Sequence, residues 1–400
     1  MLDFTTEKLL GGHSHIETNT SDTLITPTDQ SIACLSVRFP LEFDFSNPNA
    51  QILVRKQIEH HMRLCTIASS GFDTLFSTVG SEPLLAEAAS HFMTESETSP
   101  IRELSRHLDK NCINHGKRGE LVAVLLIMQA RDALSRRSMG ERSVNVCQFL
   151  ETLLGPSFVH TATTSPSKVH SEDYKKSLAD NFNDARIWFN HVLKIRKTKL
   201  INVQHLWKFL TRGAMILCAN NQPGVDIVIP VCLTGNLLSP LTTTAIIIQV
   251  KNSSTFGERI RGYLFDAMDP FEINLFDKGM DPRPIIRMVF ALASEVDVVK
   301  YADGPPRTTR TTRSSQKLDK YTSYDIWCAG ISQKIFPVIR DNEVTPYRQI
   351  LDRTRFPGQE YAVGKIHKIK YPDEVEKEKI ELLRCFDAPV WGEEDPKGGS

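Results

Sequence analysis

The chain has 400 residues, 40% of them hydrophobic, which is enough apolar material for one large domain or two modest ones. Lysine and arginine together number 48, as do aspartate and glutamate, so the formal net charge is zero. This balance excludes a global positive field, and any binding of nucleic acid therefore needs local basic patches.

Eight cysteines are scattered along the chain without a Cys-x-x-Cys pair, which argues against a zinc ribbon or a thioredoxin-type motif. Scattered thiols of this kind fit a reducing compartment. The first residues show no basic region followed by an apolar core, and the longest apolar run, 121–128, is too short to span a bilayer. We therefore expect an intracellular protein of the nucleus or cytoplasm, with no signal peptide, transmembrane segment or membrane partner.

The N-terminal third is expected to contain a disordered segment followed by helices. Residues 1–32 are polar and rich in threonine and serine, which predicts disorder. Residues 33–114 form a predicted helical region. Its expected helices are QILVRKQIEHHMRLCTIASSGF (51–72), SEPLLAEAASHFMT (81–94) and IRELSRHLDKNCINHG (101–116).

The next helix opens the predicted core domain, residues 115–300. In RGELVAVLLIMQARDAL (118–134), apolar residues recur at the helical spacing i, i+3, i+4 and i+7, so we expect one face to be buried. Glu120 lies in its first turn. Composition predicts a loop over 160–176, and residues 184–221 are expected to form one or two helices that lead into the following strand.

The segment GVDIVIPVCLTGNLLSPLTTTAIIIQVKN (224–252) predicts two strands joined by a loop that contains Gly235 and Pro240. Asp226 begins the first apolar run, and Gln249 and Lys251 end the second. Because strand side chains alternate between faces, Gln249 and Lys251 project to the same side. An acid, an amide oxygen and a lysine that meet at the edge of a sheet can hold a divalent metal and orient a water beside a phosphodiester.

The last part of the core and the C-terminal third complete the expected organisation. PIIRMVFALAS (284–294) favours a buried strand, with a short helix left open. This order of elements predicts an α/β fold, a mixed sheet of three or four strands flanked by helices. The expected C-terminal segments are an Arg/Thr-rich linker (301–321), a helical extension (322–390) that includes TSYDIWCAGISQKIFPVI, and a disordered tail (391–400).

A helix with Glu120, a strand beginning at Asp226 and a strand ending in Gln249-x-Lys251 resemble, in this order, the PD-(D/E)xK nuclease superfamily. The Gln-x-Lys form resembles its Mrr-like restriction endonucleases in particular. Val225 stands where the superfamily shorthand has Pro, at a position that varies widely. The segments SEPLLAEAA and RGELVAVLL are more distantly similar to fungal crinkler-type and transposon-related proteins, which join such a core to a P-loop ATPase. No P-loop motif occurs in this chain.

The resemblance implies a restriction-endonuclease-like sheet and a metal-dependent nuclease. Asp226 would be the central ligand of Mg²⁺ or Mn²⁺, Gln249 would add its carbonyl oxygen, and Glu120 a second carboxylate. Lys251 would orient or deprotonate the attacking water and stabilise charge on the phosphate. The implied substrate is nucleic acid, with DNA favoured over RNA, and cutting of both strands would favour a homodimer.

Other interpretations of the same residues stay open. Asp226 can be an edge carboxylate that faces water, Gln249 and Lys251 the polar end of a buried strand, and Glu120 a carboxylate favoured by the helix dipole. A catalytically inactive module that binds nucleic acid or a protein partner is the alternative function. Glutamine in place of an acid and the neutral net charge both favour it.

A basic cluster, KIRKTK (194–199), supplies candidate contacts to phosphate through Lys194, Arg196, Lys197 and Lys199. Trp188 and Phe189 precede it, and aromatic side chains beside basic ones suit stacking on bases. The competing interpretation is a solvated helix face above a buried aromatic stripe.

Overall fold

The computed structural model describes residues 2–12, 26–41, 48–71, 74–80, 82–95, 99–108, 118–137, 143–219, 222–234, 238–302 and 319–352. They belong to one compact unit, Met1–Asp352. Most of the predicted linker and the predicted tail lie outside these residues. The expected class is confirmed, because the protein is a mixed α/β structure with a mixed sheet flanked by helices.

The N-terminal region consists of helices and one small hairpin. The helices are α1 (Leu2–Leu9), α2 (Pro27–Arg38), α3 (Pro48–His60), α4 (Pro83–Glu95) and α5 (Pro100–Leu108). The strands β1 (Leu64–Ala68) and β2 (Leu75–Thr78) pair antiparallel as a separate two-stranded sheet.

Two expectations for this region are wrong in part. The predicted disorder of residues 1–32 fails at α1 and α2, because Thr26 and Asp29 form a capping box and Pro27 occupies the first turn of α2. The predicted helix 51–72 ends at His60. Met62 has a φ of 59°, which a right-handed helix cannot accommodate, and the chain continues into β1.

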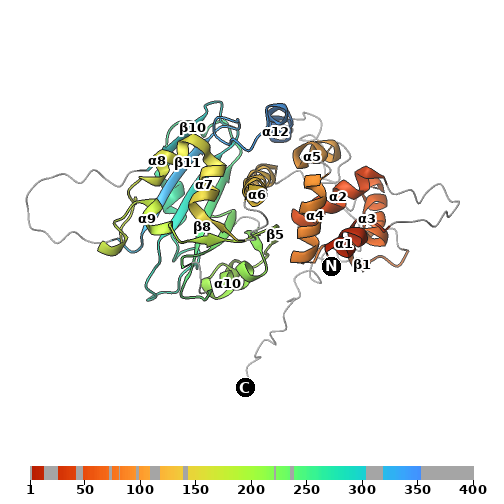
Figure 1. The fold of residues 1–400 in the computed structure, drawn as a ribbon, viewed down its shortest axis with the longest axis horizontal. Helices are drawn as coiled ribbons and strands as arrows, with labels where there is room; N and C mark the ends of the chain where they lie inside the picture. Colours follow the sequence, from red (N-terminus) through yellow and green to blue (C-terminus); the bar gives the residue numbers. More distant parts are fainter. Residues whose placement is uncertain are drawn as a thin grey trace, which may run out of the picture. The chain divides into compact units, whose positions relative to one another are not determined.

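The main sheet contains nine strands in the described residues, and Figure 1 shows it with its helices. They are β3 (Val144–Asn145), β4 (Arg186–Ile187), β5 (His191–Lys194), β6 (Ala214–Leu217), β7 (Ile227–Cys232), β8 (Thr243–Lys251), β9 (Ile285–Ala291), β10 (Val298–Tyr301) and β11 (Ser323–Ala329). The order is β10-β11-β9-β8-β7-β4-β3, while β6 also pairs with β7, and β5 pairs with β6. Strands β8, β9 and β11 run parallel to one another, and β7 is antiparallel to β8.

Helices cover both faces of this sheet. They are α6 (Arg118–Arg137), α7 (Val146–Leu154), α8 (Phe158–Ala162), α9 (Leu178–Phe182), α10 (Val203–Thr211), α11 (Gly262–Asp266) and α12 (Val344–Asp352). Ile246 and Ile248 of β8 pack in one core cluster with α6, α7 and α9, of which α7 and α9 lie over the sheet in Figure 1. Ala245 and Ile247 point to the opposite face and pack in a second cluster with α10 and α11. Alternation along β8 therefore separates the two cores.

Two segments that were expected to be helical are strands. Residues 184–221 contain β4, β5 and β6, with α10 as their helix, and residues 323–329 form β11, which lies between β9 and β10. All residues of β6 and β11 are buried, so these segments lack the apolar–polar alternation that identifies a half-exposed strand. The strand expected in 284–294 is confirmed as β9. The sheet is accordingly larger than the predicted three or four strands.

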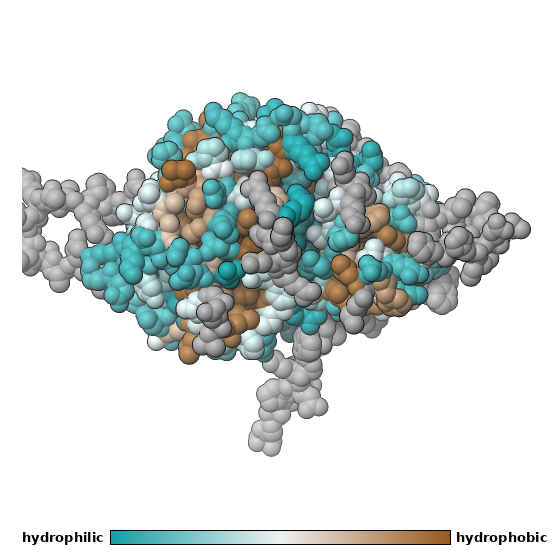
Figure 2. Space-filling view, in the orientation of Figure 1, coloured by the Kyte–Doolittle hydropathy of each residue, from teal (hydrophilic) through white to brown (hydrophobic). Residues whose placement is uncertain are grey.

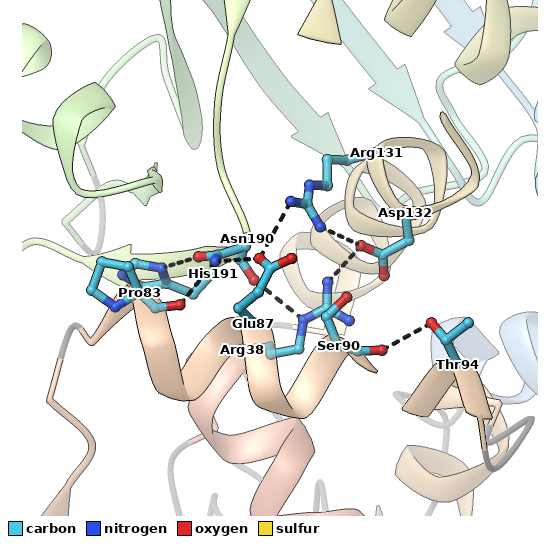
Figure 3. Close-up of polar contacts among 9 residues, drawn as sticks. All are labelled: Arg38, Pro83, Glu87, Ser90, Thr94, Arg131, Asp132, Asn190 and His191. Carbon is cyan, nitrogen blue, oxygen red and sulfur yellow. Dashed lines mark hydrogen bonds and ion pairs between the residues drawn. The ribbon is translucent and has the colours of Figure 1, made fainter. Parts of the chain in front are cut away.

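A buried charged network joins the N-terminal helices to the sheet region, as Figure 3 shows. Arg38 of α2 is 1% exposed, forms an ion pair of 2.8 Å with Asp132 of α6 and donates to the backbone oxygen of Asn190. Arg131 of α6 forms an ion pair with Asp132 at 3.2 Å and another with Glu87 of α4 at 3.6 Å. The side chain of Asn190 donates to Glu87 at 2.9 Å.

The described surface is mainly polar. In the view of Figure 2, hydrophilic residues cover most of the face, and apolar residues form small separate patches. None of the helices within the described ranges combines the length and apolar character needed to span a bilayer.

Candidate functional site

One edge of the main sheet collects the ends of seven strands. The carboxyl ends of β5, β6, β8, β9 and β11 lie there, beside the beginnings of β7 and β10. Along this edge Lys194 pairs with Leu217, Leu217 with Ile227, and Ile227 with Ile248. Ligands of open α/β sheets bind outside the carboxyl ends of the strands, so this edge is the natural place for a site.

Asp226 and Gln249 lie opposite one another at this edge. Ile227 pairs with Ile248, so one further step of the antiparallel register places Asp226 across from Gln249. The backbone N–H of Asp226 donates to the oxygen of Ile248 at 3.0 Å, which holds the residue against β8. Both side chains point to the face of the second core cluster, and directly opposed residues have Cβ atoms about 5 Å apart.

The carboxylate of Asp226 is fixed by the backbone of β8. Its Oδ2 accepts a hydrogen bond of 2.6 Å from the N–H of Val250, and the side chain is half-buried. This bond ties the acid to the strand that contains both Gln249 and Lys251. The acid and the amide are therefore held in one place before any ligand arrives.

Gln249 carries a buried oxygen that lacks a hydrogen bond. The residue is 7% exposed, and its Oε1 has no hydrogen-bond partner among the described residues. A buried acceptor left unsatisfied costs about 1–3 kcal/mol. A hard divalent cation or an ordered water satisfies such an oxygen, so this atom points to a ligand at the edge of the sheet.

Lys251 ends β8 on the same side of the strand as Gln249. It is half-buried, and its backbone oxygen accepts from the N–H of Leu292 at 3.0 Å. Within the described ranges its ammonium group makes no ion pair or hydrogen bond with another side chain. The sheet therefore brings Asp226, Gln249 and Lys251 together, as their spacing in the sequence predicts.

Glu120 approaches this edge from the other face. It lies in the first turn of α6, and the preceding Gly119 packs so tightly on β8 that a Cβ there would lie 2.8 Å from Cβ of Asn252. Asn252 directly follows Lys251. The helix itself packs in the first core cluster, whereas Asp226 and Gln249 face the second. The N-terminus of α6 thus reaches the end of β8, and Glu120 stands at the rim, half-exposed.

The basic cluster lies at the same edge but not on a helix. Lys194 is the last residue of β5, Arg196 and Lys197 follow in an exposed turn, and Lys199 lies in the short 3-10 helix η4 (Thr198–Leu200). Strand β5 is two strands away from β7, about 10 Å. The competing interpretation is therefore wrong about the helix, but Arg196, Lys197 and Lys199 are exposed to solvent as it expects.

The aromatic residues before this cluster are part of the core. Phe189 is fully buried, and its ring contacts that of Phe149 edge-on at 5.9 Å. Trp188 is half-buried against Gly213, where a Cβ would lie 3.0 Å from its ring. The buried ring of Phe189 is thus unavailable for stacking on a base.

A buried ion pair beside the site was not foreseen. Arg287 of β9 is fully buried and makes two hydrogen bonds, of 2.7 and 2.6 Å, to the carboxylate of Asp325 on β11. Burial by itself lowers the pKa of the Arg287 guanidinium. Asp325 and Tyr321 raise this pKa by more than burial lowers it, so the net shift is upward and the guanidinium stays charged. In the sequence, Arg287 and Asp325 each stand alone as the charged residue within an otherwise apolar segment. Charged residues are rarely buried without a partner, so this pattern is the signal that indicates the pair.

The described residues contain no cluster of three or more His, Cys, Asp or Glu side chains that could hold a metal ion. The candidate set has two carboxylates and depends on the amide oxygen of Gln249 for a third ligand.

Fold and site together define a mixed α/β protein with a polar site at the carboxyl ends of its strands. Residues 27–341 match the family described as Domain of unknown function (DUF8736), and the chain belongs to this family. The matched range extends from α2 past β11, so it includes the N-terminal helices and all four candidate residues. Neither the curated proteins nor the solved structures contain a match to the chain.

Proposed function

We propose that the protein is a metal-dependent phosphodiester hydrolase that acts on nucleic acid, with DNA favoured over RNA. The observation that carries this proposal is the pairing of Asp226 with Gln249, whose buried Oε1 has no partner among the described residues. Lys251, on the same side of β8, adds a cation next to these two oxygen donors. This combination supports the resemblance to the PD-(D/E)xK nucleases.

The donor set suits Mg²⁺ or Mn²⁺, both of which prefer oxygen ligands. Asp226 and Gln249 would hold the ion, and Glu120 would complete the set from the start of α6. When bound, such an ion stabilises negative charge on the phosphate in the transition state. With only two carboxylates, the site should bind Mn²⁺ more tightly than Mg²⁺.

Lys251 performs the step that belongs to the protein itself. Its ammonium group donates to the attacking water or to a phosphate oxygen and so orients the water for in-line attack on phosphorus. The hydrogen bond from Val250 holds Asp226 in place during this step, and Val250 directly precedes Lys251 in β8, so the acid is tied to the strand that supplies the lysine. As the water oxygen bonds to phosphorus, the ester P–O bond to the leaving oxygen breaks, and a proton from the water reaches that oxygen through solvent, so the products are a phosphate monoester and an alcohol.

A cleavage assay tests the proposal. Plasmid DNA, single-stranded DNA and RNA are incubated with Mn²⁺ or Mg²⁺ and with wild type, Lys251→Ala or Asp226→Asn. Each variant should lose at least about a hundredfold in rate, the usual size of a lost catalytic group. Lys176→Ala, at an exposed lysine beside Tyr324 at the start of β11 and so near the opposite edge, is the matched control and should cleave like wild type. Equal cleavage by wild type and Lys251→Ala would refute the assignment.

Metal binding separates this proposal from the inactive module, the second candidate. The set of two carboxylates and one amide favours that alternative, because it offers less charge than three acids. Titration of Mn²⁺ into the protein without nucleic acid should show one site that Asp226→Asn removes. Glu120→Gln should weaken it about tenfold if the helix reaches the ion. Nucleic-acid binding with no Mn²⁺ site would favour the inactive module.

A further inference from the structure

The loop that follows Lys251 crosses the sheet on the side of the candidate site. Residues 252–261 connect β8 to α11, and the indole N–H of Trp327 donates to the oxygen of Gly257 at 2.9 Å. Trp327 pairs with Val289, which in turn pairs with Gln249. The loop therefore extends two strands beyond the site. The next residue of the loop, Glu258, lies near β10, and its carboxylate forms an ion pair of 2.7 Å with Lys300 of that strand.

The chain then returns to the turn that precedes Asp226. The backbone oxygen of Phe265 in α11 accepts a hydrogen bond of 2.6 Å from the side chain of Arg287. Ala267 packs closely on Gly224, so a Cβ added to Gly224 would overlap the backbone oxygen of Ala267. Residues 252–267 therefore begin next to Lys251 and end against the turn before Asp226. Arg259 and Arg261 lie in the middle of this path, between Gly257, which contacts Trp327, and Phe265, which contacts Arg287.

Both arginines are available to an anion. Arg259 is exposed and Arg261 half-buried, and neither side chain makes a hydrogen bond or ion pair with another described residue. On the other side of the site, Lys197 and Lys199 are exposed and equally unpaired within the described ranges.

The carboxylates near the loop are only partly engaged. Glu258 is paired with Lys300, and Asp297 lies against Gly330 in the turn after β9. Glu295 in the same turn is exposed, and the preceding Ser294 lies beside Gly257 of the loop. The four unpaired cations therefore lie in two segments, one after β5 and one after β8, and the acid next to Arg259, Glu258, is paired with Lys300.

We infer that the Arg259–Arg261 segment and the Lys197–Lys199 segment contact phosphates on opposite sides of the proposed site. This inference rests on the proposed function and deepens it, because it gives the path of the nucleic acid. The strand runs across the ends of the sheet, from β5 past β7 and β8 towards β11. Five strand spacings of about 4.8 Å give roughly 24 Å. At about 3.4 Å per nucleotide of a duplex strand, that distance accommodates about seven nucleotides.

Binding without catalysis tests the inference. Anisotropy of a labelled duplex of about 20 base pairs is measured with the full chain in EDTA, from about 50 to 200 mM salt. The double variants are Arg259→Ala/Arg261→Ala and Lys197→Ala/Lys199→Ala. The matched control, Lys176→Ala/Lys320→Ala, removes two exposed lysines. They lie near the opposite edge, because the backbone oxygen of Lys176 accepts from the hydroxyl of Tyr324 and Lys320 comes three residues before the start of β11.

Each test variant should bind about tenfold more weakly and lose one to two units of salt slope, about 0.9 per phosphate contact, while the control matches wild type. Matching slopes for Arg259→Ala/Arg261→Ala and the control would overturn the inference, as would a wild type that binds no nucleic acid. The proposed hydrolysis is judged separately. If the double variants lose salt slope but wild type does not cleave, the binding path is kept and catalysis is rejected. If wild type cleaves but the salt slopes of the double variants equal that of wild type, catalysis is kept and the binding path is rejected. The same assay on single-stranded DNA and RNA ranks the substrates.

Discussion

Gln249 is the residue in which structure and proposed chemistry are most closely linked. A buried amide normally satisfies both its oxygen and its nitrogen, because an unpaired group costs more than a good hydrogen bond gains. The Oε1 of Gln249 remains without a partner in the described part of the chain, and it faces the same side as Asp226. Such an atom is retained at a cost in stability, which a ligand would offset.

The stability of Gln249 variants should therefore depend on metal. Gln249→Glu places a carboxylate in the same buried position, which should lower the free energy of unfolding by about 1–3 kcal/mol without metal. Saturating Mn²⁺ should restore this loss and raise stability further, because it binds only the folded state. Gln249→Met removes the unpaired oxygen, so its stability should equal or exceed that of wild type and should not respond to Mn²⁺. Urea denaturation with and without Mn²⁺ measures the free energy of unfolding of the two variants. An equal response of the two variants would contradict the metal role.

His191 should make the fold sensitive to acid. Burial, with Arg212 and Arg38 adding to its effect, lowers the pKa of His191 from 6.5 to about 4. Between these values the unfolded chain binds more protons than the folded one, so the free energy of unfolding falls as the pH drops from about 6.5 to 4. The loss is about 2 kcal/mol at pH 5 and about 3 kcal/mol at pH 4.

Urea denaturation at pH 7 and pH 5 measures this effect, with His191→Gln as the comparison. The variant should lose less stability over that interval than wild type. Some acid sensitivity should remain, because burial also lowers the pKa of His61. Identical pH dependence in both proteins would mean that His191 does not titrate as its burial requires.

At the scale of elements, the turn before β7 positions the acid of the proposed site. Gly224 has a φ of 78°, and a Cβ there would overlap the oxygen of Ala267. Gly224→Ala should cost about 1–2 kcal/mol for the backbone conformation and about 1–3 kcal/mol more for the overlap. Gly279→Ala is the matched control, because Gly279 has a φ of 91° with nothing within 4 Å, so only the first cost applies.

Thermal unfolding and Mn²⁺ titration of the two glycine variants give the comparison. Gly224→Ala should also weaken Mn²⁺ binding, since the displaced turn leads directly into Asp226, and Gly279→Ala should not. Equal losses in stability for both variants would mean that the contact with Ala267 yields easily and does not position the strand.

The sequence allowed the local part of this site to be predicted but not its surroundings. Asp226, Gln249 and Lys251 belong to two consecutive strands, so a hairpin and the alternation of side chains are enough to bring them together. The position of Lys194 depends on the parallel pairing of β5 with β6, across an intervening helix, which no local pattern specifies. The sequence of β11 favours a helix over a strand for a related reason. Both of its faces are buried, and Asp325 finds its partner, Arg287, far away in the sequence.

At the scale of the whole described unit, buried charges couple the N-terminal helices to the sheet. Arg38, Glu87, Arg131 and Asp132 come from three helices, and Asn190 links them to the start of β5. Breaking a buried ion pair leaves an uncompensated charge and commonly costs about 3–5 kcal/mol. The family match from residue 27 to 341 includes both sides of this network, so one family unit contains the contact.

Loss of this contact should uncouple the unfolding of the two regions. Arg38→Met keeps the apolar stem but removes the charge, and it should lower stability by about 3 kcal/mol. Arg106→Met, at an exposed arginine that pairs with Glu103 within α5, should cost less than about 0.5 kcal/mol. The tryptophans of the described residues, Trp188, Trp207 and Trp327, all belong to the sheet region, so their fluorescence reports on that region, whereas circular dichroism also reports on the N-terminal helices. In wild type and Arg106→Met the two urea transitions should coincide. In Arg38→Met the helical signal should be lost at lower urea than the fluorescence signal, and coinciding transitions there would show that apolar packing alone couples the two regions.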